Sequence, residues 1–135
     1  MSQENVEIVR RSADAWQRDD FEVWLSLIDP DVAWHIGIDR AFGSNVLHGH
    51  EGMHELWSFW RTEFDGLWIA PDEIRDLGGE RVLLLGRGRA HGRASGLMIE
   101  SELAQLMTLR DGNLVRSEDY LSHDEALKAV GLEDG

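Results

Sequence analysis

Apolar side chains recur every three or four residues in the first half of the chain, which is the spacing of amphipathic helices. One such set predicts a first helix: Val6, Val9, Ala13 and Trp16. A second helix is expected to begin near Asp20 and to reach Ile28, where Pro30 ends it because a proline disfavours helical geometry in the residue before it. A third helix is expected from about His50 to Phe64. Its buried face is formed by Met53, Trp57, Trp60 and Phe64.

The pattern changes to strands from Leu67 onward, and an earlier strand is expected from Val32 to Ile38. Glycine-containing pairs mark three hairpin turns in this half: Gly78–Gly79, Ser95–Gly96 and Asp111–Gly112. Ser122 begins a short final helix, because a serine followed three residues later by Glu125 is a capping box. Helices followed by a meander of strands predict an α+β fold, in which the helices cover one face of a curved, mostly antiparallel sheet. A pocket is expected between the two layers.

The composition agrees with a single domain over residues 1–135. Apolar residues make up 42% of the chain, and the lack of cysteine excludes disulfides, a thiol nucleophile and a Cys-ligated metal. The sequence has neither an apolar run long enough to span a membrane nor a signal peptide, so we expect a cytoplasmic protein. Its 26 acidic and 13 basic residues give a net charge of −13, which disfavours binding to nucleic acids and to anionic membranes.

The segment His50–His54 reads H-E-G-M-H and matches the zinc-binding pattern H-E-x-x-H. On a helix, His50 and His54 would bind one zinc ion and Glu51 would serve as general base. Three features disfavour this interpretation: the segment lies at the start of its helix, Glu51 points away from the face that Met53 defines, and no third ligand stands at a suitable position. We therefore expect no metal and no cofactor, and keep a zinc hydrolase only as a remote alternative.

Basic side chains alternate with small ones between Gly86 and Arg93, so that a strand there would carry its cations on one face. These cations are Arg87, Arg89, His91 and Arg93. One interpretation is that Arg87 and Arg89 point into the pocket and bind a polar or anionic group of a ligand. The other is that the cations pair with Glu100 and Glu102 on the next strand. A shift of the register by one residue exchanges the two faces, so the sequence leaves both interpretations open.

Asp119 is the candidate acid or base. A carboxyl group on the concave face, among apolar side chains, would have a raised pKa and would exchange a proton near neutral pH. The alternative is a structural ion pair between Asp119 and Arg87. Near Asp119 we expect the pocket to be lined by Trp34, Ile36, Trp57, Trp60, Arg89 and Met107. These aromatic groups favour a flat, apolar ligand.

Several segments, in this order along the chain, resemble the SnoaL-like branch of the nuclear transport factor 2-like superfamily. They are Leu27–Trp34, Gly49–Met53, Gly92–Gly96, Leu109–Val115, Tyr120, Glu125–Leu127 and Gly131–Leu132. The resemblance covers nearly the whole chain and implies a cone-shaped α+β fold, a homodimer and an apolar pocket inside the cone. The superfamily includes ketosteroid isomerases, polyketide cyclases, limonene epoxide hydrolase and members without known catalysis. The fold is therefore implied more firmly than the reaction.

The resemblance to limonene epoxide hydrolase implies roles for individual residues. Asp119 matches one catalytic aspartate of that enzyme and Arg87 matches its arginine. The second aspartate, however, is replaced by Arg89. The tyrosine and asparagine that position water are replaced by Trp34 and Ile36. These departures disfavour epoxide hydrolysis.

In ketosteroid isomerase, the position of Ile36 is occupied by the catalytic base and the position of Gln105 by an acidic residue that donates a hydrogen bond to the oxyanion. By this resemblance the chain lacks the base, whereas Gln105 can still donate a hydrogen bond.

We predict a protein that binds a small, largely apolar molecule. Isomerase, cyclase or hydrolase chemistry would use Asp119 as acid or base, with Arg87 and Gln105 orienting or polarising the substrate. The alternative is a non-catalytic, dimeric ligand-binding module in which Arg87 and Asp119 form a structural pair.

Overall fold

The computed structural model describes residues 2–36 and 46–131. Three helices come first in the chain, interrupted by two strands: α1 (Ser2–Gln17), α2 (Phe21–Ser26), β1 (Ile28–His35), β2 (Val46–His48) and α3 (Gly49–Glu63). Four strands and a short helix follow: β3 (Phe64–Gly78), β4 (Arg81–Gly92), β5 (Met98–Arg110), β6 (Asn113–Tyr120) and α4 (His123–Ala129). Within the described residues, no helix is both long enough and apolar enough to cross a membrane.

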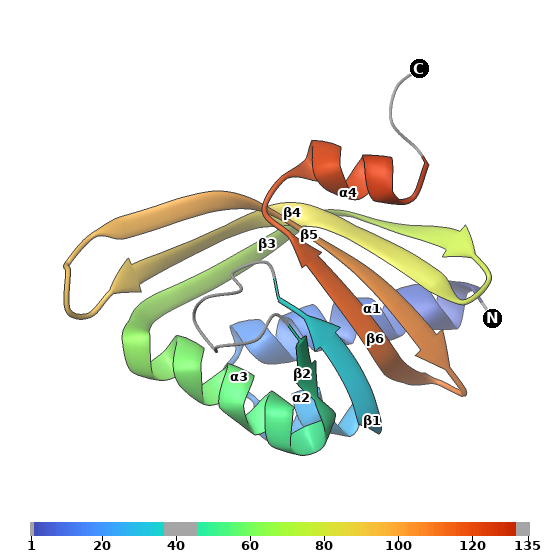
Figure 1. The fold of residues 1–135 in the computed structure, drawn as a ribbon, viewed down its shortest axis with the longest axis horizontal. Helices are drawn as coiled ribbons and strands as arrows, with labels where there is room; N and C mark the ends of the chain where they lie inside the picture. Colours follow the sequence, from blue (N-terminus) through green and yellow to red (C-terminus); the bar gives the residue numbers. More distant parts are fainter. Residues whose placement is uncertain (1, 37–45, 132–135) are drawn as a thin grey trace.

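The strands form one curved sheet in the order β2-β1-β6-β5-β4-β3. β1 and β6 run parallel, and the other neighbouring strands are antiparallel. Helices α1, α2 and α3 lie on the concave side of the sheet, and α4 lies on the opposite side (Figure 1). The predicted α+β fold, with N-terminal helices covering a curved and mostly antiparallel sheet, is therefore confirmed.

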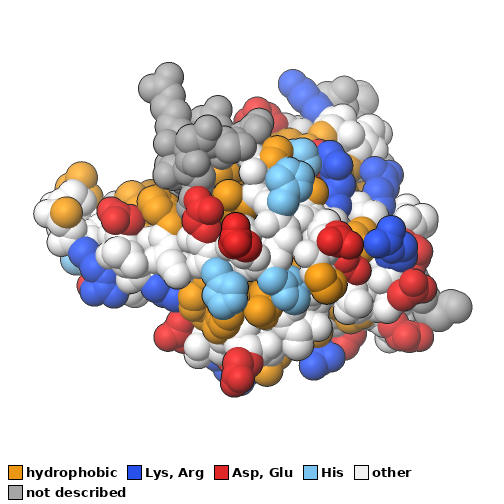
Figure 2. Space-filling model, turned by 60° about the horizontal axis from the view of Figure 1, so that its bottom comes forward, with side chains coloured by type: hydrophobic (Ala, Val, Ile, Leu, Met, Phe, Trp, Pro, Cys, Tyr) orange, Lys and Arg blue, Asp and Glu red, His pale blue; other side chains and the backbone are white. Residues whose placement is uncertain are grey.

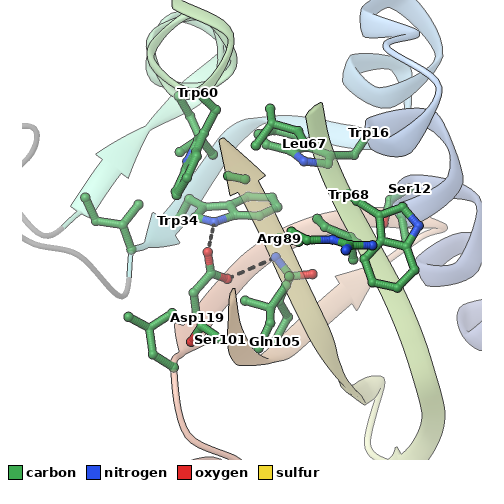
Figure 3. A pocket seen from close by; sticks show the side chains of 18 of the residues that line it. Ser12, Trp16, Trp34, Trp60, Leu67, Trp68, Arg89, Ser101, Gln105 and Asp119 are labelled. Atoms are coloured by element: carbon green, nitrogen blue, oxygen red, sulfur yellow. Dashed lines mark hydrogen bonds between the residues drawn. The ribbon is translucent and has the colours of Figure 1, made fainter. Parts of the chain in front are cut away.

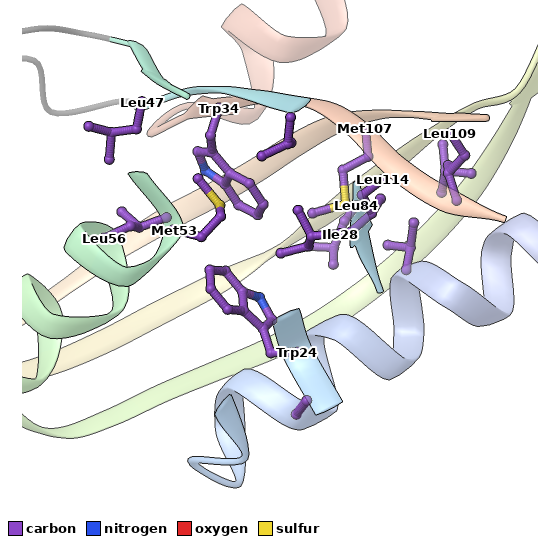
Figure 4. Close-up of a cluster of buried hydrophobic side chains, with 14 residues drawn as sticks. Trp24, Ile28, Trp34, Leu47, Met53, Leu56, Leu84, Met107, Leu109 and Leu114 are labelled. Atoms are coloured by element: carbon purple, nitrogen blue, oxygen red, sulfur yellow. The ribbon is translucent and has the colours of Figure 1, made fainter. Parts of the chain in front are cut away.

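The alternation of side chains along β4 separates two cores. Val82 and Leu84 face α1, α2 and α3 and belong to the larger core, which Figure 4 shows between those helices and the sheet. Leu83 and Leu85 face the other way and pack with Ala126 of α4. Because successive side chains on a strand point to opposite faces, these contacts also fix the facing of every later residue of β4.

The second helix and the first strand differ from the prediction in their bounds. Helix α2 begins at its Asp20 cap, whose Oδ1 accepts a hydrogen bond from the Val23 N–H (3.3 Å), but it ends at Ser26. Ile28 therefore belongs to β1, and Pro30 lies inside that strand. The proline is tolerated because the pairing of β1 with β6 is irregular between Ile28 and Ala33. Residues 37 and 38 of the predicted strand lie outside the described part of the chain.

The turn and cap signals are confirmed. The Asp111–Gly112 turn between β5 and β6 has φ values of 52° and 81°, the left-handed conformation of a tight hairpin turn. The Ser122 Oγ accepts a hydrogen bond from the Glu125 N–H (3.3 Å) at the start of α4. Strand β2 was not predicted, because three residues are too few to show a period.

Gly49, the first residue of α3, provides a test of how this helix is attached to β1. Its φ is +68°, and a Cβ added there would lie 3.1 Å from the Pro30 carbonyl oxygen. We expect Gly49→Ala to lower the free energy of unfolding by about 2 kcal/mol, through the left-handed conformation and the crowding together. Urea denaturation measures this loss.

The matched control is Gly96→Ala, because Gly96 has a φ of +72° but no atom within 4 Å of an added Cβ. It should show the conformational cost alone, about 1 kcal/mol. Equal losses for the two variants would contradict the role assigned to the contact with Pro30.

Candidate functional site

A cavity of about 190 Å³ lies between the concave face of the sheet and helices α1 and α3. Its walls are mainly apolar and aromatic, as the close view in Figure 3 shows. The principal contributors are Trp16, Trp24, Trp34, Phe59, Trp60 and Met107. Asp119 lines the cavity beside Trp34 and is an ionisable side chain among these apolar groups. The polar residues that contribute atoms to the lining are Ser12, Arg89, Ser101, Glu102 and Gln105.

Asp119 is held by hydrogen bonds from both neighbouring strands, because β6 lies between β1 and β5. On the β1 side, the Trp34 Nε1–H donates to Oδ2 (2.8 Å). On the β5 side, the Gln105 Nε2–H donates to Oδ1 (3.2 Å) from the residue directly opposite Asp119. Ser117, two residues earlier on the same face, donates its hydroxyl to Oδ1 (3.1 Å). All three donors are neutral, and no basic side chain among the described residues pairs with Asp119.

Burial raises the pKa of the Asp119 carboxyl group from 3.8 to about 6. The hydrogen bonds from Trp34, Ser117 and Gln105 favour the ionised form and limit the rise. Asp119 is therefore mostly ionised at neutral pH and takes up a proton in mildly acidic solution. A carboxyl group with such a pKa is suited to accept and return a proton.

The hydrogen bonds leave one oxygen of Asp119 with spare capacity. Oδ1 accepts from both Gln105 and Ser117, whereas Oδ2 accepts only from Trp34 among the described residues. A carboxylate oxygen accepts about two hydrogen bonds, so Oδ2 retains one lone pair. Oδ2 is thus the oxygen with capacity for a hydrogen bond from a ligand.

Five of the six predicted pocket residues line the cavity: Trp34, Ile36, Trp60, Arg89 and Met107. Arg89 lies where the cavity meets solvent, with its guanidinium carbon 4.9 Å from the ring centroid of the exposed Trp68. The sixth residue, Trp57, is placed differently from our expectation. Its ring packs between Phe21, Trp24 and Trp16, outside the cavity lining. Trp60 is one helical turn further along α3 and faces the cavity instead.

Arg87, which we had assigned a catalytic role, does not line the pocket. It follows Leu85 by two residues on β4, so it shares the face that packs against α4, directly opposite Glu102 of β5. The pKa of Glu102 is lowered chiefly by the His123 N–H, with a further contribution from the positive charge of Arg87. The structure therefore shows the cross-strand arrangement for Arg87, and the alternative ion pair between Arg87 and Asp119 is not formed.

The two histidines of the H-E-G-M-H segment have separate partners. His50 Nε2 lies 2.8 Å from the Ile28 carbonyl oxygen, and the His54 ring packs on Phe21 at a centroid distance of 4.6 Å. Glu51 is exposed on the surface of α3. Gly52 is buried against Leu47 of β2, since an added Cβ would lie 3.1 Å from that side chain. Among the described residues, no three His, Asp or Glu side chains are grouped closely enough to share a metal ion.

Sequence reasoning missed two residues that shape this site. Ser117 is fully buried and bonded to Asp119, and its position two residues before the aspartate on the same strand was a usable signal. Gly88 forms part of the cavity wall, where an added Cβ would come no closer than 3.9 Å to the Trp68 carbonyl oxygen. Its role was not visible, because it depends on which face of β4 meets the helices.

Comparison with known proteins agrees with this architecture. The sequence model of the SnoaL-like domain matches residues 9–117. The chain belongs to the SnoaL-like domain family. None of the curated proteins is significantly similar to it in sequence.

Three solved structures of this fold are similar to the chain over most of its length. A nuclear transport factor 2-like protein of unknown function from Burkholderia pseudomallei is 26% identical, with a TM-score of 0.79 and coverage of 93% of this chain and 95% of the other. TerC, co-crystallised with polyporic acid, is 25% identical, with a TM-score of 0.77 and coverage of 96% and 97%. A protein of ketosteroid isomerase-like fold from Catenulispora acidiphila, in complex with trimethylamine, is 19% identical, with a TM-score of 0.73 and 93% coverage of both chains.

The pKa of Asp119 predicts how stability depends on pH. The folded pKa of about 6 lies above the unfolded value of about 3.9, so the wild type loses stability as the pH rises from about 4 through 6. Asp119→Asn does not titrate, so its unfolding free energy relative to wild type should rise by about 2–3 kcal/mol between pH 4 and pH 8. Urea denaturation across this range measures the difference, and other titrating groups cancel between the two proteins. A difference independent of pH would contradict the raised pKa.

Proposed function

We propose that this SnoaL-like protein binds a compact, largely apolar molecule in the cone pocket and that Asp119 accepts a proton from it. The observation that supports this proposal is the Asp119 carboxyl group, held by three neutral donors in an apolar cavity. With a pKa of about 6, Asp119 removes a proton from a weakly acidic group and then returns it. Isomerisation and cyclisation are reactions of this class.

Trp34, Gln105 and Ser117 act in this proposal as positioning residues. Their hydrogen bonds fix the plane of the carboxylate and leave Oδ2 with capacity for one further hydrogen bond. Removal of one donor would raise the pKa of Asp119 further, because burial would then be opposed by fewer hydrogen bonds. Arg87 has no part in the proposed site, since it lies on the other face of the sheet.

A second candidate function, ligand binding without catalysis, is favoured by a specific observation. The Trp34 N–H and the hydroxyl groups of Ser12 and Ser101 all donate to protein acceptors. Negative charge that develops on a substrate needs donors of its own, and the removal of one such donor typically costs a factor of 10²–10³ in rate. A pocket with a base but few free donors binds a ligand more readily than it stabilises an oxyanion.

We also expect a homodimer and a cytoplasmic location, as the sequence and the family resemblance imply. The exposed apolar side chains Leu97, Met98 and Ile99, at the start of β5, offer a surface for subunit contact. Light scattering coupled to size-exclusion chromatography measures the oligomeric state directly.

The proton-transfer role is tested with a panel of one- and two-ring ketones and phenols. Compounds that raise the melting temperature identify ligands, and bound ketones are then followed by NMR for exchange of their α-hydrogens with deuterium. We expect Asp119→Asn to slow this exchange at least 100-fold, because the amide cannot accept the proton. Binding without exchange in the wild type would support the non-catalytic alternative.

A larger side chain on the sheet side of the cavity tests whether the ligand binds there. Gly88→Leu adds a side chain to the cavity wall, and the space around its Cβ leaves the backbone undisturbed. We expect ligand affinity to fall at least tenfold, as measured by calorimetry with the best compound of the panel. The matched control is Arg87→Leu, on the opposite face of the same strand, which should leave affinity unchanged. Equal effects of the two variants would place the ligand elsewhere.

A further inference from the structure

The cavity wall combines indole rings with the Asp119 carboxyl group. Trp16, Trp34 and Trp60 contribute indole rings to the lining. Figure 3 shows Trp60 above Trp34, with the Asp119 carboxylate directly below the Trp34 ring. The face of an indole ring carries partial negative charge, so it attracts a cation brought within about 6 Å of its centroid. The site therefore combines two kinds of group that stabilise positive charge.

The same aromatic cluster already binds one cation, the protein's own Arg61. The Arg61 guanidinium carbon lies 3.5 Å from the Trp57 centroid and 4.5 Å from the Trp16 centroid. Arg61 Nη1 is buried and has no hydrogen-bond partner among the described residues, so ring faces take the place of acceptors around it. Trp16 belongs both to this contact and to the cavity wall. Because Arg61 already lies over the Trp16 ring, the cation of a ligand is assigned to Trp34 and Trp60.

The charge of Asp119 has no cationic counterpart in the described part of the chain. Its three donors are neutral, Oδ2 has capacity for one further hydrogen bond, and Asp119 lines the cavity. The other charged lining residues each stand opposite a residue of opposite charge on the neighbouring strand: Arg89 opposite Glu100, and Glu102 opposite Arg87. A buried charge without a partner is costly, and a ligand of opposite charge offsets this cost.

The field of the whole protein acts in the same direction. The net charge of the chain is −13, and Figure 2 shows acidic side chains distributed over the face that carries α3. Such a field raises the local concentration of cations and repels anions. An anionic ligand would meet both this field and the Asp119 carboxylate.

We propose that the pocket takes a compact organic ammonium ion, with its cationic group between the Asp119 carboxylate and the indole faces of Trp34 and Trp60. This inference rests on the proposed function only in that the same pocket binds a small molecule; toward an ammonium ion, Asp119 acts as counter-ion, as in the non-catalytic alternative. The size agrees with such a ligand: an engineered cavity of about 150 Å³ holds a benzene molecule, and this cavity measures about 190 Å³. The apolar part of the ligand occupies the remaining aromatic wall.

A pair of probes with one shape and different charge tests the proposal. Choline carries a trimethylammonium group, and 3,3-dimethyl-1-butanol has a carbon atom in place of the nitrogen. NMR titration of the Trp34 indole N–H resonance, assigned with Trp34→Phe, reports binding next to Asp119. We expect the wild type to bind choline at least tenfold more tightly than the neutral alcohol.

Two variants separate the local carboxylate from the overall charge. Asp119→Asn should reduce the preference for choline to less than threefold while leaving the affinity for the alcohol nearly unchanged. Glu118→Gln removes the same charge from the adjacent residue, which bonds Arg116 on the other face, and should keep the preference. Trp60→Leu keeps the carboxylate and removes one ring face, so it should weaken choline binding several-fold with little effect on the alcohol.

Equal affinity of the wild type for both probes would overturn the assignment of an ammonium ligand while leaving an apolar pocket in place. A preference for choline that persists in Asp119→Asn would also overturn it. Absence of binding by either probe would count against the ammonium class, and the proposed function would then depend on the ketone panel and the Gly88→Leu variant. The two proposals thus fail by different measurements.

Discussion

The site depends on the strict alternation of side chains on the curved sheet. Two packed layers cover this sheet, with α1, α2 and α3 on the concave face and α4 on the other. A residue such as Leu84 must face the large core, which obliges Arg87, three positions later, to face α4. The same rule brings Asp119 and Gln105 to the concave face as opposite neighbours on β6 and β5. A one-residue slip would exchange polar and apolar groups across the whole sheet.

Within this frame, the chemistry of Asp119 results from two opposing effects. Burial in an apolar wall disfavours the carboxylate, while hydrogen bonds from Trp34, Gln105 and Ser117 favour it. Neither effect dominates completely, so the pKa of about 6 lies close to neutrality. A cationic partner such as Arg87 would have lowered the pKa and satisfied the charge. Its absence from the concave face leaves Asp119 available to a ligand.

The two tryptophans of α3, Trp57 and Trp60, have different roles because they lie on different sides of the helix. Trp57 packs with Trp24 and carries Arg61 on its ring face, outside the cavity lining. Trp60 faces the cavity and stays in contact with Phe59 and Phe64. The H-E-G-M-H segment at the start of the same helix serves its attachment to the sheet, through Gly49 beside Pro30 and Gly52 beside Leu47. Its histidines contribute a backbone contact and a ring contact.

The sequence by itself determined the helices, the hairpin turns, the fold class and Asp119 as the candidate base, because these rest on spacing along the chain and on local turn chemistry. Only the tertiary structure decided that Trp60 rather than Trp57 lines the cavity, and that Arg87 faces α4. The reason is that Val82–Leu85 are all buried, on alternating faces against two different cores, so the run shows no polar-apolar alternation from which the facing of β4 could be read. The donors of Asp119 likewise come from strands far apart in sequence, and only the strand order brings Trp34 and Gln105 to either side of it.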